Sequence, residues 1–207
     1  MSAIKLYRHP LSGHSHRVEA QLSLLGLDAE IIDVDLMKGA QKQAEFLRKN
    51  SFGQVPALDD GAVTISDSNA ILVYLATKYD NDRTWYPSDL AEQAEVQRFL
   101  SVAAGKIAFG PAAARLVNVF GAGLDHKTAI DTSHGILALL EAHLEGRNWL
   151  ATNNPTIADT ANYAYIAHAP EGDVSLEAYP NVRAWIKRFE LLKGFVEFTS
   201  TPVGLSA

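Results

Sequence analysis

The first part of the chain, up to residue 80, changes between alternating and helical patterns of apolar residues. Residues 3–9 and 29–36 are rich in strand formers, which predicts two β-strands. Residues 15–26 carry apolar side chains at helical spacing and end at a glycine, which predicts a helix. Residues 39–50 are predicted to form a second, more polar helix. The predicted order up to this point is strand, helix, strand, helix.

A hairpin and another helix complete this first part. Pro56 precedes two short apolar runs that flank the turn dipeptide Asp60-Gly61, and this arrangement predicts a β-hairpin. The helix that follows has Ser66 as its predicted N-cap and apolar residues along one face. The complete order is βαβαββα, which is typical of a thioredoxin-like domain.

The pattern changes near residue 80, and strand signals are lacking beyond it. Residues 81–88 are polar and lack a period, so we predict a linker that ends in a helix cap at Ser88 or Asp89. Helical patterns then run over about residues 89–119, 125–145, 156–169 and 180–194.

We therefore predict an α/β plus all-α protein. Its expected parts are a thioredoxin-like domain at residues 1–80, a linker at 81–88 and an all-helical domain at 89–207. Thr156 and Asp159 in the helical domain have the spacing of a capping box, which is a folding signal.

Composition limits the possible chemistry. Hydrophobic residues make up 47% of the chain, which is enough to form buried hydrophobic cores. Acidic residues number 24 against 18 lysines and arginines, and the resulting net charge of -6 argues against a nucleic-acid partner. The chain has no cysteine, which excludes disulfides, zinc-thiolate sites and a cysteine nucleophile. Any thiol chemistry must therefore use a thiol brought from outside.

The amino end shows no basic region followed by a long apolar stretch. Apolar runs elsewhere do not approach the length of a membrane span. We therefore expect a soluble, cytoplasmic protein with no membrane partner.

Several stretches, taken in their order and spacing, resemble glutathione transferases, and the phi class most closely. Three of them are IKLYRHPLSGHSHRV at 4–18, DLMKGAQKQAEFLRKNSFGQVPAL at 35–58 and SDSNAILVYLATKY at 66–79. Two more are PTIADTANYAY at 155–165 and AYPNVRAWIKRF at 178–189. The resemblance covers nearly the full length and implies glutathione as a co-substrate, with no cofactor.

The resemblance implies that GQVP, at residues 53–56, holds the cysteinyl part of glutathione. Pro56 resembles the cis-proline of thioredoxin-like folds, and a cis bond costs proline only about 0.5–1 kcal/mol. Val55 would then offer its backbone groups to glutathione as a strand edge does, with Gln54 in the same site. From the residues alone, a trans proline at an ordinary strand start is equally open.

Both ends of the tripeptide have candidate contacts. Ser68 begins a helix whose amino end favours the γ-glutamyl carboxylate, and Asp67 would pair with the ammonium group. The candidates for the glycyl carboxylate are Gln41 and Lys42, with Lys38 as a spare cation. Asp67 stands where the family usually has glutamate, and Gln41 where the phi class often has histidine. Taken in isolation, helix caps and an exposed charged helix explain all of these side chains.

The loop PLSGHSHRV, at residues 10–18, is expected to activate the thiol. A thiol of pKa about 8.5 is only a few per cent thiolate at neutral pH, so activation requires a pKa lower by about two units, or about 2.7 kcal/mol. Ser12 matches the catalytic serine of the phi class, and its hydroxyl would donate a bond of about 1.5–3 kcal/mol to the thiolate. From the residues alone, Ser12 and Ser15 are equal candidates for this role and for a helix cap.

Other polar residues near this loop have ordinary explanations. Tyr7 is the alternative activating residue, since other classes use a tyrosine, but a half-buried strand tyrosine is the ordinary interpretation. His14 and His16 are two residues apart and would face different sides of a helix. Carboxylates do not join them at ligand spacing, so we predict no metal site.

The electrophile is expected in a pocket between the two domains. Its predicted lining is Leu11, Phe109, Leu116 and Phe120, although apolar positions on helices are more often core. Phe52 aligns with an aromatic residue that some relatives insert into a partner subunit, which implies a homodimer.

These inferences predict a detoxification enzyme in which the glutathione thiolate attacks small hydrophobic electrophiles. Two alternatives remain open. The same site would serve the reduction of organic hydroperoxides or small disulfides, and a protein of this fold can also bind glutathione or another ligand without catalysis.

Overall fold

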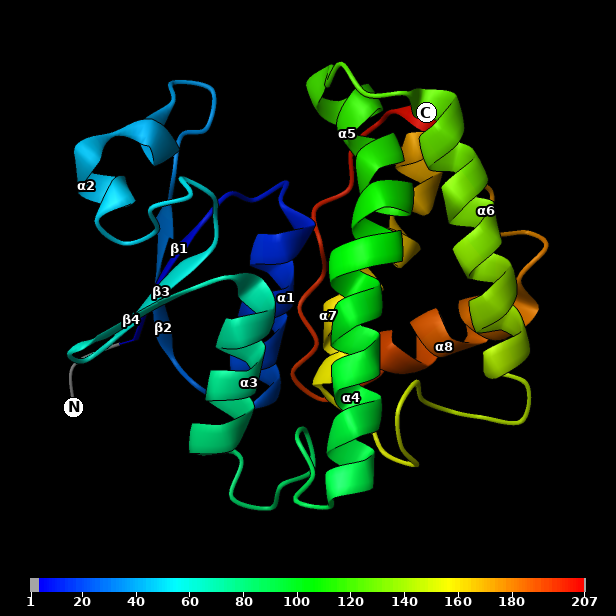
Figure 1. Cartoon of the computed structure of the whole chain (residues 1–207), viewed down its shortest axis with the longest axis horizontal. Helices are drawn as coiled ribbons and strands as arrows, with labels where there is room; N and C mark the ends of the chain where they lie inside the picture. The colour runs from blue at the N-terminus through cyan, green and yellow to red at the C-terminus, as the bar shows by residue number, and fades with distance from the viewer. Residues whose placement is uncertain (1–3, 207) are drawn as a thin grey trace. The chain divides into compact units, whose positions relative to one another are not determined.

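The chain folds into two compact units in the computed structural model, which describes residues 4–206 (Figure 1). The first unit contains the residues up to Arg83 together with Lys193–Thr199. The second contains Thr84–Leu192 and the residues from Ser200 onward. A thioredoxin-like α/β fold in the first unit and helices in the second confirm the predicted fold class.

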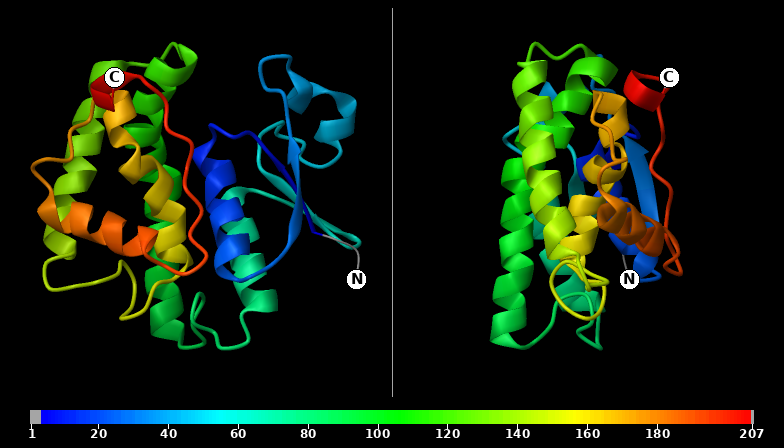
Figure 2. Two further views of the ribbon diagram at one scale, coloured as in Figure 1. Left: turned by 180° about the vertical axis from the view of Figure 1, so that it is seen from behind. Right: turned by 90° about the vertical axis from the view of Figure 1, so that its right-hand side faces the viewer.

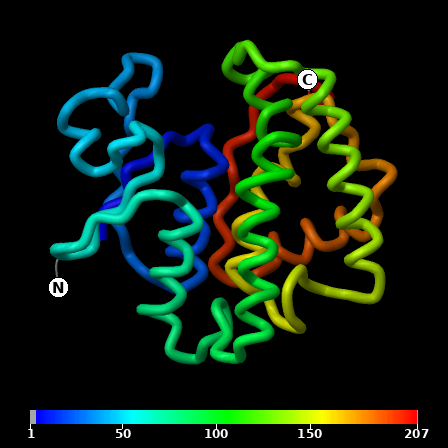
Figure 3. The backbone as a smooth tube through the Cα atoms, viewed as in Figure 1, coloured from blue at the N-terminus to red at the C-terminus, as the bar shows by residue number. Residues whose placement is uncertain are grey.

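The first unit is built on a four-stranded mixed sheet with the order β2-β1-β3-β4. Its elements are β1 (Ile4–Arg8), α1 (Gly13–Leu24), β2 (Ala29–Asp33), the 3-10 helix η1 (Ala40–Lys42), α2 (Ala44–Leu47), β3 (Ala57–Asp60), β4 (Val63–Ser66) and α3 (Ser68–Tyr79). β1 is parallel to β2 and antiparallel to β3, and β3 pairs with β4 across the predicted hairpin, which leads into α3 (Figure 3). The observed order is the predicted βαβαββα.

Helices cover both faces of this sheet. α1 and α3 pack on one face, where the buried core consists of Ile4, Leu6, Val18, Leu22, Leu58, Ile71 and Leu75. Phe46 of α2 packs on the other face with Val34 and Ala57. Leu6 is paired with Leu58 across β1 and β3, and both are fully buried on the α1 and α3 face. Alternate strand residues therefore serve two cores, which is the pattern that predicted the strands.

Two local predictions in this unit are wrong. The helix predicted at residues 39–50 is divided into η1 and the short α2, because Gln43 between them has extended backbone, with φ -76° and ψ 149°. The N-cap of α3 is Asp67 rather than Ser66, and the Asp67 side chain accepts from the Ala70 amide at 2.9 Å. Ser66 instead ends β4, where it pairs with β3.

The segment Lys193–Thr199 returns to the first unit, which the sequence pattern did not indicate. Nε2 of His16 lies 2.7 Å from the carbonyl oxygen of Val196, and the rings of His16 and Phe198 are 4.9 Å apart between centroids. Gly194 has a φ of 91°, and a side-chain carbon there would lie 2.8 Å from a carbonyl oxygen of α1. Glycine therefore permits the close approach of this segment to α1.

The second unit begins with a long helix that changes its winding. Its elements are α4 (Leu90–Val102), the π-helical η2 (Ala103–Ala112), α5 (Ala113–Phe120), α6 (His126–His143), α7 (Ile157–Ala167), the 3-10 helix η3 (Ala169–Gly172), α8 (Pro180–Glu190) and the 3-10 helix η4 (Gly204–Ser206). α6 lies alongside this long helix (Figure 2). Of the two caps that we expected for the first helix, Asp89 is the one used, since it accepts from the Ala91 and Glu92 amides.

Contrary to our expectation from the sequence, the segment Leu90–Phe120 is long and apolar enough to cross a membrane, judged by length and composition alone. A core helix of a folded domain meets the same criteria. α4 and η2 pack against α7, and η2 also packs against α6. Their buried side chains include Val96, Phe99 and Ile107. These contacts are those of a core helix.

The predicted capping box is confirmed at the start of α7. The Thr156 amide donates to Asp159 Oδ2 at 2.9 Å, and the Ala158 amide donates to Thr156 Oγ1 at 3.2 Å. Asp159 also accepts from the Leu150 amide and from Trp185 Nε1. Burial raises the pKa of Asp159 despite these bonds. The carboxyl group thus joins three segments of the helical unit.

Candidate active site

The loop between β1 and α1 places Ser12 and Ser15 in different environments. Ser12 is the N-cap of α1, and its Oγ accepts a hydrogen bond from the Ser15 amide at 3.2 Å. Ser15 is fully buried, and its Oγ accepts from the His9 amide at 3.2 Å. Each hydroxyl acts as an acceptor in these bonds and keeps its own hydrogen for donation. Ser12 is half-buried, so of the two it is the one that a ligand can reach.

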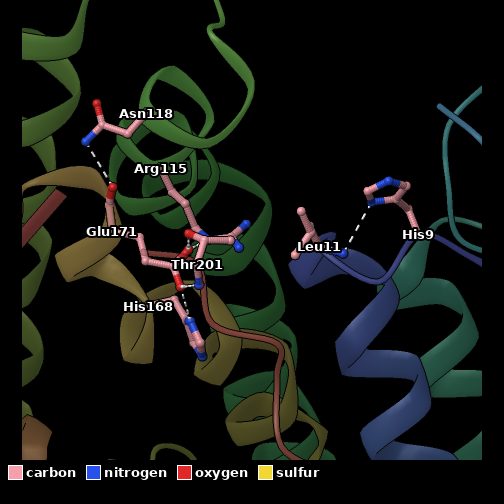
Figure 4. Close-up of polar contacts among 7 residues, drawn as sticks. All are labelled: His9, Leu11, Arg115, Asn118, His168, Glu171 and Thr201. Carbon is pink, nitrogen blue, oxygen red and sulfur yellow. Dashed lines mark hydrogen bonds and ion pairs between the residues drawn. The ribbon is translucent and has the colours of Figure 1, made fainter. Parts of the chain in front are cut away.

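His9 supports the same loop (Figure 4). Its Nδ1 accepts a hydrogen bond from the Leu11 amide at 3.2 Å. A ring nitrogen that accepts is unprotonated, so neutral His9 carries its hydrogen on Nε2. Burial lowers the pKa of His9, which favours this neutral form. His9 therefore holds the loop as an acceptor rather than as a cation.

Val55 lies just before the start of β3 and outside both of its ladders. The Val55–Pro56 bond is cis, and the pairing of β3 with β1 and with β4 begins at Ala57. Val55 is half-buried. Its backbone N–H and C=O therefore take part in neither ladder of β3.

Asn50 shapes the turn that leads to this position. The residue is buried, its Nδ2 donates to the Gln54 carbonyl oxygen at 2.7 Å, and its Oδ1 accepts from the Phe52 amide at 3.1 Å. One side chain therefore holds the turn between residues 50 and 54 at two points. Sequence reasoning missed it, because an asparagine in a polar stretch resembles any other loop residue.

Gln41 and Lys42 lie against the same turn. Lys42 Nζ donates to the Phe52 carbonyl oxygen at 3.3 Å. Gly53 has a φ of 60°, and a side-chain carbon at Gly53 would lie 2.9 Å from the Gln41 carbonyl oxygen and from Lys42 Nζ. The structure therefore brings η1 close to the residues that precede Val55.

The amino end of α3 combines a strained cap with a buried arginine. Asp67 has φ 71° and ψ 121°, a backbone conformation that is rare outside glycine and is often found at functional sites. Ser68 follows it and is buried. Nη1 of Arg17 donates to Ser68 Oγ at 3.2 Å and to Asn69 Oδ1 at 2.8 Å. Sequence reasoning missed Arg17, which lies 51 residues from Ser68 along the chain.

Comparison with known proteins identifies the family. Residues 2–77 match the model for the glutathione S-transferase N-terminal domain, and residues 125–192 match that for the glutathione S-transferase C-terminal domain. Glutathione S-transferase 3 of Zea mays is 36% identical, over 89% of this chain and 88% of its own length. The chain belongs to the glutathione S-transferase family.

Other relatives of this glutathione S-transferase come from several organisms. Glutathione S-transferase theta-2 of Homo sapiens is 33% identical, over 82% of this chain and 73% of its own length. The structure of a glutathione transferase homologue from Drosophila mojavensis, with bound glutathione, matches with a TM-score of 0.86 and 32% identity, over 93% of this chain and 89% of that one. A glutathione S-transferase from Pseudomonas fluorescens matches with a TM-score of 0.89 and 28% identity, over 96% of this chain and all of that one, 100%.

The hydroxyl group of Tyr7 in this glutathione S-transferase is engaged in a hydrogen bond. It donates to Asp59 Oδ2 at 3.0 Å, and Lys49 Nζ lies 2.6 Å from the same oxygen and 4.3 Å from the centre of the Tyr7 ring. Burial by itself raises the pKa of Asp59, but bonds from Lys49, Thr64 and Tyr7 leave that pKa below its ordinary value. The hydroxyl of Tyr7 thus links β1 to a carboxylate on β3.

The cations and histidines near the site have partners of their own. Lys38 is exposed and pairs with Asp35 at 3.2 Å. His16 is bonded to Val196, and burial together with the charge of Arg17 lowers the pKa of His14 to about 3. Between residues 4 and 206, no group of three or more histidine, aspartate or glutamate side chains is arranged to hold a metal ion.

The residues predicted for the electrophile pocket are divided between the two units. Leu11 is half-buried in the first unit, whereas Phe109, Leu116 and Phe120 lie in η2 and α5 of the second. Phe109 is 72% exposed, and Phe52 is 78% exposed in the turn that Asn50 holds. The pocket and the role of Phe52 in a dimer stay predictions.

Replacing Asn50 with alanine is expected to weaken glutathione binding. The variant loses both bonds to the turn, so the free energy of unfolding should fall by about 1–2 kcal/mol. The KM for glutathione should rise about three- to tenfold, because binding must then order the turn. Steady-state kinetics and urea unfolding measure the two effects. Asn50→Asp keeps the acceptor for the Phe52 amide but puts a second acceptor against the Gln54 carbonyl oxygen, so it should raise this KM as well. An unchanged KM in a destabilised Asn50→Ala protein would contradict this role.

Proposed function

We propose that Ser12 activates glutathione in this transferase and that the resulting thiolate attacks small hydrophobic electrophiles. The observation that carries the proposal is the position of Ser12: it is half-buried at the N-cap of α1, and its Oγ accepts from the Ser15 amide, so its hydrogen remains for donation. The hydroxyl therefore meets a bound thiolate as a donor and stabilises the anion.

The energies are sufficient for this role. A bond from a hydroxyl to a thiolate contributes about 1.5–3 kcal/mol, and the amino end of a helix adds up to about 1 kcal/mol. Lowering the thiol pKa by about two units requires about 2.7 kcal/mol. One hydroxyl and one helix end are therefore enough, and a general base is not required.

The rest of the tripeptide would extend along the first unit. The backbone of Val55, after Gln54 and before Pro56, would pair with the cysteinyl residue. Asp67 and Ser68 at the amino end of α3 would take the γ-glutamyl group. Gln41 and Lys42 would face the glycyl carboxylate, because they lie against the turn that ends at Gln54. These placements are supported by the geometry of the turn. The similar structure from Drosophila mojavensis contains bound glutathione, which supports a glutathione site in this fold.

The chemical step needs no further group. The thiol proton passes to solvent as the thiolate forms beside Ser12. With 1-chloro-2,4-dinitrobenzene, the sulfur then forms a bond to the ring carbon that carries chlorine, and chloride leaves with its bonding electrons. The products are the conjugate, chloride and one proton, so the step is balanced. The role of the protein is to bind and orient glutathione and to stabilise the negative charge of its thiolate.

Three finer assignments belong to the same proposal. We propose that the enzyme is of the phi class, which its serine loop and its plant relatives support. Leu11, Phe109, Leu116 and Phe120 are proposed to contact the electrophile. A cytoplasmic homodimer that uses the exposed Phe52 is proposed for its assembly.

Turnover of 1-chloro-2,4-dinitrobenzene with glutathione tests the proposal. We expect saturable dependence of the rate on glutathione and a conjugate that is detected by absorbance and by mass spectrometry. Cumene hydroperoxide is assayed in parallel, and a much higher kcat/KM with it would assign the enzyme as a peroxidase instead. Glutathione binding by calorimetry without turnover of any electrophile would refute the catalytic proposal.

A further inference from the structure

Arg17 is an arginine at 1% exposure in the first unit. It lies on α1, and α1 packs beside α3 on the same face of the sheet. The side chain spans this contact, because its Nη1 reaches both Ser68 and Asn69 in the first turn of α3. Burial of a guanidinium group costs free energy, so the buried position of Arg17 indicates a specific role for its side chain.

The bond from Arg17 fixes the role of the Ser68 hydroxyl. Because Arg17 can only donate, Ser68 Oγ is the acceptor at 3.2 Å, and the serine keeps its own hydrogen. Nδ1 of His14 is 3.4 Å from the same oxygen, which is longer than a strong hydrogen bond. Burial first, and then the charge of Arg17, lower the pKa of His14 to about 3, so His14 is neutral near pH 7. Neutral His14 can accept the Ser68 hydrogen at Nδ1, but the bond is long at 3.4 Å. An anion at the amino end of α3 would compete with His14 for that hydrogen.

Two sources of positive potential meet at this point. The guanidinium of Arg17 is charged at every accessible pH, and the amino end of α3 carries the positive end of the helix dipole. Asp67 accepts from the Ala70 amide and is exposed, so it faces solvent rather than the buried guanidinium. An anion that contacts Ser68 would gain from the charge and the dipole together.

We propose that Arg17 is a positioning residue for the α-carboxylate of the γ-glutamyl group, and that it acts through Ser68. It holds Ser68 Oγ as an acceptor, which turns the hydroxyl hydrogen outward as a donor to the carboxylate. It also holds Asn69 and places a fixed charge behind the first turn of α3. This inference rests on the proposed glutathione site and adds a residue that the ligand itself does not touch.

Three thiols test the proposal against the functional groups of the ligand. They are glutathione, glutaryl-Cys-Gly, which keeps the carboxylate and lacks the amine, and 4-aminobutanoyl-Cys-Gly, which keeps the amine and lacks the carboxylate. In Arg17→Gln, the KM for glutathione and for the glutaryl analogue should rise about tenfold. The KM for the aminobutanoyl analogue should change less than about twofold, since this analogue has no carboxylate to lose.

Arg115→Gln is the matched control. Arg115 is also 1% exposed, but it lies in the second unit, where it pairs with Glu171. Its loss should lower stability and change KM for the three thiols alike. Arg17→Lys should recover part of the selectivity, since lysine keeps the charge while losing the two-point contact. If Arg17→Gln fails to fold, Ser68→Ala removes the same donor and should show the same selectivity for the carboxylate-bearing thiols.

The outcomes separate this inference from the proposed function. Equal increases of KM for all three thiols in Arg17→Gln would overturn the positioning role and leave a structural one. A parent enzyme that turns over glutathione and the aminobutanoyl analogue with the same KM would overturn it as well, while leaving the transferase intact. A parent that neither binds nor turns over glutathione would instead refute the proposed function.

Discussion

Ser12→Ala is expected to lower kcat/KM for glutathione and 1-chloro-2,4-dinitrobenzene by about 10- to 100-fold near neutral pH. The reason is the loss of a bond to the thiolate of about 1.5–3 kcal/mol, since each 1.36 kcal/mol corresponds to a factor of ten. The effect should fall on the thiol pKa rather than on glutathione binding, because Ser12 is proposed to contact the sulfur alone.

The pH profile gives this prediction its sharpest test. The thiol of bound glutathione should titrate about one to two units higher in the variant. The rate of the parent then reaches its plateau at a lower pH than the rate of Ser12→Ala, which continues to rise with pH until its own thiol ionises. The ratio of the two rates should therefore shrink as the pH increases. Ultraviolet absorbance of the bound thiolate measures the same pKa independently.

Neighbouring hydroxyls supply the controls. Ser12 also caps α1, so Ser12→Ala should cost about 1 kcal/mol of stability, while Ser12→Thr keeps both the cap and a donor. Tyr7→Phe removes a bond to Asp59, and Ser15→Ala removes the acceptor of the His9 amide. Neither should raise the thiol pKa. A raised thiol pKa in Ser15→Ala and an unchanged one in Ser12→Ala would exchange the roles of the two serines.

Among the variants proposed for this protein, Glu171→Gln is expected to cause the largest loss of stability. Glu171 Oε2 lies 2.6 Å from Arg115 Nε, and both side chains are almost completely buried (Figure 4). The Thr201 amide and hydroxyl donate to the same carboxylate at 3.0 and 2.8 Å, and His168 Nδ1 lies 2.7 Å from it. Removing the negative charge leaves a buried arginine without its counter-ion, so the free energy of unfolding should fall by about 3–5 kcal/mol.

Low pH should reduce the difference in stability between the parent and Glu171→Gln. Burial by itself raises the pKa of Glu171, but bonds from His168 and Thr201 and the charge of Arg115 leave that pKa below its ordinary value of 4.5. A carboxylate with a depressed folded-state pKa contributes stability above the unfolded-state value, and this contribution is lost as the pH falls through the folded-state value. The gap between parent and Glu171→Gln in urea unfolding should therefore be full near pH 7 and should shrink below about pH 4.5.

A double variant separates the charge from the packing. Arg115→Met with Glu171→Leu replaces the ion pair by apolar side chains and should recover much of the stability that Glu171→Gln loses. If Glu171→Gln unfolds within about 1 kcal/mol of the parent, the buried pair contributes little, and the prediction fails.

Local patterns in the sequence determined much of this fold. The order βαβαββα followed from alternation in the strands and from helical spacing, because both patterns record which side of an element is buried. The capping box of Thr156 and Asp159 was equally readable, since its two partners are three residues apart. The absence of cysteine also established that any reactive thiol must come with a ligand.

Tertiary structure alone decided how the candidate site is supported. Asp67 rather than Ser66 caps α3, because Ser66 is used in the β3–β4 ladder. Arg17 bonds Ser68 because α1 and α3 pack side by side, and His16 meets Val196 across 180 residues of chain. Periodicity records the burial of each residue but not the partner it meets. Pairing between distant polar groups depends on how the elements pack, so it became visible only in the folded chain.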